Sequence, residues 1–140
     1  MKIAVRYHTR SGNTQRLAAA AADALSVTAG DMTVPLEERV DILFLGCSYY
    51  AFDVDEAVKR YLAENREMIG KIVCFGTSAM MRSMKKPIAK IAAAMNIPVA
   101  EEEFHCRGSF GPLHKGRPDA EDLAAAAAFV RNVAERGLET

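Results

Sequence analysis

Short apolar runs alternate with longer amphipathic stretches along the chain, and this alternation restricts the possible folds more than any other feature. Strands are expected over 3–7, 40–46, 71–76 and 99–106, with a short edge strand within 27–34, and helices over 14–25, 54–65, 83–95 and 119–136. Asp119, with Asp122 three residues on, is expected to cap the last helix, and Gly137 to end it. The run Val40–Gly46 is almost entirely apolar, which is typical of a strand covered on both faces. We count five β–α units with short connections, and this order predicts a parallel sheet with helices on both faces.

The length of 140 residues matches the usual size of one domain, and half of the residues are apolar. We therefore expect a single domain over 1–140 with a full core. In sheets of this kind a ligand binds beyond the carboxyl ends of the strands. The segments of interest are those that follow the strands, at 7–14, 47–53, 77–84 and 107–118.

The first of these segments has the composition of a phosphate site. Thr9, Ser11 and Thr14 supply hydroxyl groups, Asn13 supplies an amide, and Gly12 permits close backbone approach. Backbone N–H groups at the start of a helix bind anions, aided by the helix dipole. A plain helix cap is the alternative interpretation, since Ser, Thr and Asn cap helices in any protein. A cap needs only one such residue, so the cluster favours a phosphate site.

The segment Thr9-Arg10-Ser11-Gly12-Asn13-Thr14 resembles the T/S-x-T/S-G-N-T phosphate loop of flavodoxins, which also directly follows the first strand. Later segments resemble the same family in order. Residues 45–52 resemble its second flavin loop, residues 70–78 its fourth strand and third flavin loop, and residues 104–108 and 116–119 the closing segment of its short-chain members. The resemblance implies a three-layer α/β fold, a five-stranded parallel sheet in the order 2-1-3-4-5, and an FMN site.

By position, the resemblance assigns residues of three loops to FMN. Residues 9–14 would surround the phosphate, and the backbone of 48–51 and 77–79 would meet the polar edge of the ring. Tyr49 or Tyr50 would stack on the isoalloxazine, with Phe52 as a third candidate; a hydrophobic lid is the alternative interpretation of these aromatics. The implied cofactor-binding residues are Thr9, Arg10, Ser11, Gly12, Asn13, Thr14, Ser48, Tyr49, Tyr50, Ala51, Phe52, Gly76, Thr77, Ser78 and Ala79.

Several other functions lack the residues that they need. The dinucleotide fingerprint GxGxxG and the hydrolase elbow GxSxG are absent, and the first loop holds neither a phosphatase cysteine nor a Walker lysine. His8, His105 and His114 form no evident catalytic set. Glu101–Glu103 would point to alternate faces of a strand, which favours solvation over metal binding. We therefore expect no catalytic residue and no metal site.

The cysteines and the chain start indicate a cytoplasmic protein. Cys47, Cys74 and Cys106 include no CxxC pair, so neither a disulfide framework nor a zinc site follows. Cys47 and Cys106 should lie two strand spacings apart, about 10 Å, which is too far for a disulfide, so buried thiols are expected. The chain enters a strand at once instead of a signal peptide, and no apolar run is long enough to span a membrane.

The charges balance at 18 Lys and Arg against 18 Asp and Glu, for a formal net charge of zero. This balance argues against nucleic-acid binding, which needs a basic excess. It also departs from the strongly acidic composition that the resemblance to electron-carrier flavodoxins would imply. Arg82, Lys85 and Lys86 follow the third flavin loop and are either a solvated helix face or a source of positive potential beside the flavin. In the second case they would favour an anionic reduced flavin or an anionic partner.

Taken with the resemblance, these observations favour an FMN-binding electron-transfer protein over an enzyme with its own substrate, because such a carrier needs no acid–base catalyst. Two alternatives stay open. One is a small FMN-dependent, quinone-type reductase that uses the same site. The other is an interaction module that keeps the fold but has lost tight FMN binding. The expected partner is a redox protein that the sequence does not identify, and the chain would be a monomer or a weak homodimer.

Overall fold

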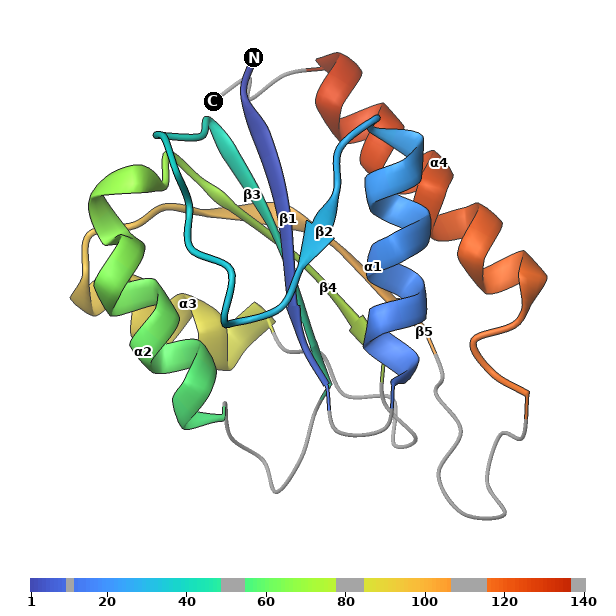
Figure 1. Ribbon diagram of the computed structural model, residues 1–140, viewed down its shortest axis with the longest axis horizontal. Helices are drawn as coiled ribbons and strands as arrows, with labels where there is room; N and C mark the ends of the chain where they lie inside the picture. Colours follow the sequence, from blue (N-terminus) through green and yellow to red (C-terminus); the bar gives the residue numbers. More distant parts are fainter. Residues whose placement is uncertain (10–11, 49–54, 78–84, 107–115, 137–140) are drawn as a thin grey trace.

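A five-stranded parallel sheet forms the centre of the computed structural model, which describes residues 1–9, 12–48, 55–77, 85–106 and 116–136 (Figure 1). The strands are β1 (Ile3–His8), β2 (Ala29–Gly30), β3 (Ile42–Ser48), β4 (Ile72–Thr77) and β5 (Val99–Cys106), in the order β2-β1-β3-β4-β5. The helices are α1 (Asn13–Ala24), α2 (Glu56–Asn65), α3 (Lys85–Ala94) and α4 (Ala120–Arg136), with a 3-10 turn, η1 (Arg66–Met68), after α2. Helices α1 and α4 cover one face, and α2 and α3 cover the other. The predicted fold class and strand order are confirmed.

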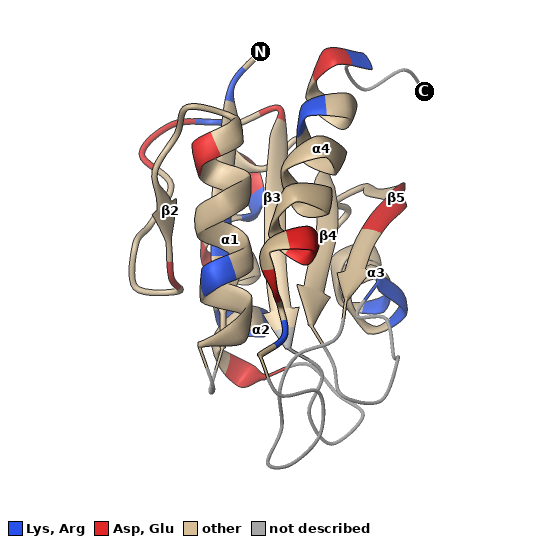
Figure 2. Cartoon of the chain, turned by 90° about the vertical axis from the view of Figure 1, so that its right-hand side faces the viewer, with Lys and Arg blue, Asp and Glu red and all other residues tan. Residues whose placement is uncertain are grey.

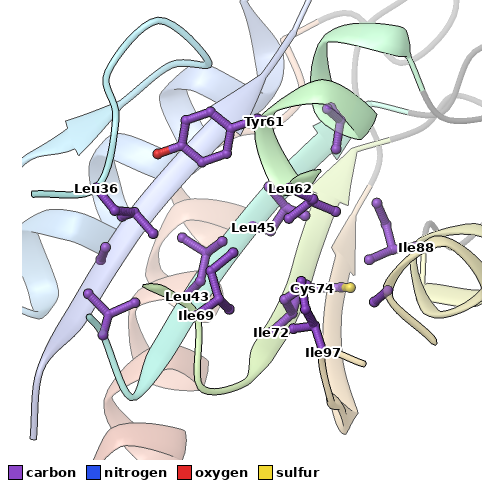
Figure 3. Close-up of a cluster of buried hydrophobic side chains, with 14 of the residues drawn as sticks. Leu36, Leu43, Leu45, Tyr61, Leu62, Ile69, Ile72, Cys74, Ile88 and Ile97 are labelled. Atoms are coloured by element: carbon purple, nitrogen blue, oxygen red, sulfur yellow. The ribbon is translucent and has the colours of Figure 1, made fainter. Parts of the chain in front are cut away.

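Burial on both faces explains why the strands read as apolar runs. All six residues of β4 are buried, and consecutive side chains point to opposite faces. On the side of α2 and α3 the core contains large aliphatic groups such as Leu45, Leu62 and Ile88 (Figure 3). On the side of α1 and α4 small residues such as Ala18 and Ala126 line the core, which lets those two helices pack closely.

The region between β1 and β3 contains the short edge strand that was predicted within 27–34, where Ala29 and Gly30 pair with β1. No helix lies between β2 and β3, so the described residues form four β–α units with a helix, and the expected five is wrong. A local turn explains the early end of the strand: the Asp31 carboxylate accepts hydrogen bonds from the Thr33 backbone N–H, at 2.8 Å, and from its hydroxyl. Pro35 then lacks the N–H that a ladder needs.

A polar contact holds this region where a helix is missing. The Tyr61 hydroxyl of α2 donates to the Val34 carbonyl at 2.7 Å and accepts from Arg6 Nε at 3.0 Å. Arg6 of β1 also donates to the carbonyls of Val34 and Pro35. Burial raises the pKa of Tyr61, whose side chain is nearly inaccessible, so the hydroxyl stays protonated as a donor.

Candidate functional site

The carboxyl ends of four strands lie side by side at one edge of the sheet, which we call the carboxyl edge. His8 of β1 is in register with Cys47 of β3, which is in register with Gly76 of β4, and Gly76 is in register with His105 of β5. The segments that follow these strands contain most of the predicted FMN contacts. Of these, Arg10, Ser11, Tyr49, Tyr50, Ala51, Phe52, Ser78 and Ala79 lie outside the described residues, as do Arg82 and His114.

A buried pair of hydroxyl groups joins two of the predicted loops. Thr14 Oγ1 in the first turn of α1 lies 3.0 Å from Thr77 Oγ1 at the end of β4, and the two residues are 0% and 2% exposed. Buried hydroxyls are kept where they have polar partners, because an unsatisfied one is costly. The structure thus brings together two predicted site residues that are 63 positions apart in the sequence.

The start of α1 has an unusual backbone. Gly12 is the N-cap residue and has a φ of +87°, a left-handed conformation that favours glycine. Its N–H donates to Thr9 Oγ1 at 3.1 Å, and Asn13 beside it is buried. A Cβ at Gly12 would meet no described atom within 4 Å, so glycine is required by the backbone conformation and not by crowding. The first turn of α1 contains no acidic residue.

Glycine is required at positions 46 and 76 by crowding, in contrast to Gly12. A Cβ on Gly76 would lie 2.1 Å from the carbonyl oxygen of Cys47, and one on Gly46 would lie 2.5 Å from the ring of Phe75. Both distances are far below van der Waals contact, so packing between β3, β4 and their neighbours demands these glycines. The predicted contact of Gly76 with a cofactor stays a prediction, and packing alone already explains that residue.

The starts of α2 and α4 are capped by carboxylates from the chain itself. Asp55 precedes α2 and accepts from the Ala57 N–H at 2.9 Å. At α4, Asp119 accepts from the Asp122 N–H at 3.0 Å, and Asp122 accepts from the Asp119 N–H at 2.9 Å, which forms a reciprocal capping box. The cap at Asp119 was predicted. Gly137, the predicted end of α4, lies outside the described residues.

Two contacts between a basic and an acidic side chain at the carboxyl edge were missed from the sequence. Arg117 donates two hydrogen bonds to Asp122, at 2.6 and 2.9 Å, and they hold the pKa of that carboxyl below its usual value. His8 Nε2 lies 3.2 Å from Asp55 Oδ2, and both side chains are 23% exposed. The signal that could have revealed Asp55 is an acid directly before a predicted helix on the carboxyl side of a strand, the same rule that identified Asp119.

The thiols are buried and free, as predicted. Burial raises the pKa values of Cys74 and Cys106 to about 12 and also raises that of Cys47, so all three stay protonated near neutral pH. Within the described part of the chain, no group of three or more His, Cys, Asp or Glu side chains is placed to hold a metal ion. None of the described helices is both long and apolar enough to cross a membrane.

No protein-family model matches the sequence, and no curated protein matches it. Comparison with solved structures gives a clear result. A flavodoxin from the domain Archaea superposes with a TM-score of 0.77, covering 97% of this chain and 98% of that chain at 18% identity. This chain has the flavodoxin fold. Flavodoxin 2 from Bacillus cereus gives a TM-score of 0.70 at 16% identity, covering 98% of this chain and 100% of its own. A flavodoxin, WrbA-like protein from Agrobacterium tumefaciens gives 0.68 at 17% identity, covering 96% and 95%.

Proposed function

We propose that this flavodoxin-fold chain binds FMN at the carboxyl edge of its sheet and works as an electron carrier. The observation that carries the proposal is the start of α1. There a left-handed glycine and a first turn without acids adjoin a buried hydroxyl pair, Thr14 and Thr77. An anion of the size of a phosphate monoester suits such a place, because the helix dipole and hydroxyl donors both favour negative charge.

The residues present fit the phosphate end of FMN. Thr9, Gly12, Asn13 and Thr14 would hold the phosphate, and Thr77 would position the Thr14 hydroxyl from the neighbouring strand end. FMN, when bound, supplies one- and two-electron transfer, while the protein supplies binding, orientation and electrostatics. The aromatic residues proposed for stacking on the ring are Tyr49, Tyr50 and Phe52, which lie outside the described residues.

A quinone-type reductase that uses the same FMN is the second candidate, and one observation favours it. The imidazole of His8 and the carboxylate of Asp55 form a pair at the carboxyl edge. Reduction of a quinone to a hydroquinone consumes two electrons and two protons, and an imidazole next to a carboxylate is a common proton donor in enzymes. A one-electron carrier has no need of this pair.

Flavin titrations test the proposal. The purified apoprotein is titrated with FMN and, separately, with riboflavin, and flavin fluorescence quenching gives both dissociation constants. We expect one FMN per chain and a riboflavin affinity at least about a hundredfold weaker, which corresponds to about 2.7 kcal/mol from the phosphate. Equal affinities for FMN and riboflavin would contradict a phosphate site at α1. Binding of neither flavin would contradict both FMN-dependent functions and favour the interaction module that has lost tight FMN binding.

A turnover assay then separates the two candidate functions. The FMN-loaded protein is mixed with NADPH or NADH and a soluble benzoquinone, and nicotinamide oxidation is followed by absorbance. A carrier should show no turnover above free FMN. Catalysis that falls at least about tenfold in His8→Gln would instead favour the reductase, because removal of a general acid typically costs a hundredfold or more.

A further inference from the structure

Helix α3 has a different charge pattern from the other described helices. Its residues Lys85–Ala94 include three lysines and no acid, whereas α1, α2 and α4 each contain acidic residues. In the whole sequence no acid occurs between Glu67 and Glu101. A solvated helix face usually mixes both signs, as α2 does with Glu56 and Lys59, which lie 3.4 Å apart.

Two of the three lysines are exposed and pair with no acid in the described part of the chain. Lys85 is paired with Glu101 of β5 at 3.1 Å. Lys86 and Lys90 are exposed and make no ion pair within the described residues. The other exposed bases of the described helices that lack a partner, Arg60 and Arg131, each have an acid four residues away. We call Lys86, Lys90 and the exposed Ala93 the α3 basic face.

This arrangement does not serve the stability of the helix. Lys86 lies in the first turn, where the positive end of the helix dipole disfavours a cation by about 0.3–1 kcal/mol. Lys86 and Lys90 are four residues apart, so their like charges repel one another by a few tenths of a kcal/mol. The two charges of this face therefore lower the folding stability slightly, and no described acid offsets that cost by pairing with them.

The α3 basic face is on the helix that follows β4, the strand that ends at Thr77 of the candidate FMN site. Helix α3 begins toward the carboxyl edge of the sheet (Figure 1). Figure 2 shows the blue residues of α3 at this end of the molecule, while the red residues of β5 lie further from it. Lys90 is one helical turn beyond Lys86, about 6 Å along the axis. The residues next to these lysines on the helix include Ala89 and Ala93. Their small side chains leave room for a partner to approach the two ammonium groups.

We propose that the α3 basic face docks a redox partner protein through a cluster of acidic side chains on that partner. The inference rests on the proposed electron-transfer function and adds the charge of the partner to it. Complementary charge steers a partner to the edge where electrons would be exchanged, and it acts mainly on the association rate. Glu101 pairs with Lys85, and this leaves Lys86 and Lys90 as the exposed charges of α3 that a partner would meet.

The first test measures binding and needs no flavin. Fluorescein-labelled poly-L-glutamate is titrated with the full-length protein at low salt, and anisotropy is recorded for the wild type, Lys86→Glu/Lys90→Glu, and Arg60→Glu/Arg131→Glu. The two double variants change the net charge equally, and all four positions are exposed. We expect salt-sensitive binding that weakens at least about tenfold in the α3 variant and less than about threefold in the control. Equal losses in both variants would overturn the proposal, because they would reflect net charge alone.

The same titration decides between an acidic protein and other polyanions. A single-stranded oligo-dT and vesicles containing phosphatidylserine are titrated in parallel. Tighter binding to either of these than to poly-L-glutamate, lost in the α3 variant, would overturn the proposal in favour of a nucleic acid or a membrane surface. Circular dichroism melting of each variant verifies that the fold is intact.

The second test measures electron transfer with FMN bound. The reduced protein is oxidised in a stopped-flow instrument by ferricyanide, an anion, and by hexaammineruthenium(III), a cation. We expect the ratio of the ferricyanide rate to the ruthenium rate to fall about tenfold in Lys86→Glu/Lys90→Glu at low salt. An unchanged ratio would overturn the proposal. Failure to bind FMN would refute the proposed function, and the poly-L-glutamate result would still decide whether the α3 basic face binds acidic chains.

Discussion

Helices α1 and α4 begin at the same edge of the sheet, yet they treat their first backbone N–H groups in opposite ways. At α4, Asp119 and Asp122 accept hydrogen bonds from each other's N–H groups. At α1 the N-cap is Gly12, which has no side chain, and no acid stands in the first turn. Helix α4 thus brings its own anion, whereas none of the described residues supplies one to the start of α1, as the proposed phosphate site requires.

The two helix starts are also joined, which makes the comparison local. Arg16 of α1 donates a hydrogen bond to the carbonyl of Pro118, directly before α4. Arg117, next to Pro118, is held by Asp122. The guanidinium groups of Arg16 and Arg117 are therefore both bound by groups at the start of α4. Through Arg16, the self-capped helix α4 supports α1, the helix that we propose to bind phosphate.

The strongest way to break the comparison is to give α1 the carboxylate that α4 has. We expect Gly12→Asp to weaken FMN binding by about a hundredfold or more, because a second anion would stand where the phosphate binds. Asp tolerates a left-handed backbone better than most residues, and the uncharged Gly12→Asn imposes the same shape. Titration with FMN and riboflavin measures the effect. Equal FMN affinities for the Asp and Asn variants would contradict a phosphate site, and riboflavin affinity should be alike in both.

The reciprocal change removes the anion from α4. We expect Asp122→Asn to lower the free energy of unfolding by about 1–2 kcal/mol, because the two hydrogen bonds from Arg117 lose their charged acceptor, and to leave FMN affinity within about threefold. Urea denaturation measures the first quantity. Glu121→Gln in the same turn is the matched control, since Glu121 is exposed and should change stability by less than about 0.5 kcal/mol. A loss of FMN affinity larger than the loss of stability would show that both helix starts serve the ligand.

The same carboxylate predicts a pH dependence. The bond from Arg117 keeps the pKa of Asp122 below its ordinary value, so the unfolded chain binds its proton at a higher pH than the folded chain does. This contribution to stability is complete above the ordinary pKa of an aspartate and is lost as the pH falls through the folded value. Urea titrations between pH 6 and pH 3 should show a steeper fall for the wild type than for Asp122→Asn. Parallel pH profiles of the unfolding free energy for the wild type and Asp122→Asn would contradict this. The difference between the two profiles cannot exceed the unfolding free energy that Asp122→Asn loses at neutral pH.

Local patterns in the sequence were sufficient for the sheet, because buried parallel strands such as β3 and β4 must be apolar. The phosphate site at the first loop stays a prediction. Contacts that depend on register between distant elements could not be predicted. The sequence names Thr14 and Thr77, but only the pairing of the strands puts their hydroxyls 3.0 Å apart.

The features that were missed have physical causes of the same kind. The count of five β–α units is wrong because a side-chain turn at Asp31 follows β2 where a helix would have completed the fifth unit. The hydrogen bond from Tyr61 to Val34, which holds this segment, joins separate parts of the chain and could not be predicted from either one. The contact of Asp55 with His8 was overlooked because His8 ends a strand 47 positions earlier in the sequence.

Helix α2 sharpens the comparison with the smallest effect, because Asp55 both caps the helix and faces His8. If the cap dominates, Asp55→Ala should cost about 1 kcal/mol, and Asp55→Asn only a few tenths, since Asn caps as well as Asp does. If the ion pair dominates, the Asn variant should cost as much as the Ala variant. We expect the first result, because partly exposed ion pairs contribute less than about 1 kcal/mol. Urea denaturation of both variants, with and without His8→Gln, gives the coupling energy between His8 and Asp55. A coupling above about 1 kcal/mol would mean that Asp55 serves His8 more than the helix, and α2 could then no longer be grouped with the self-capped helix α4.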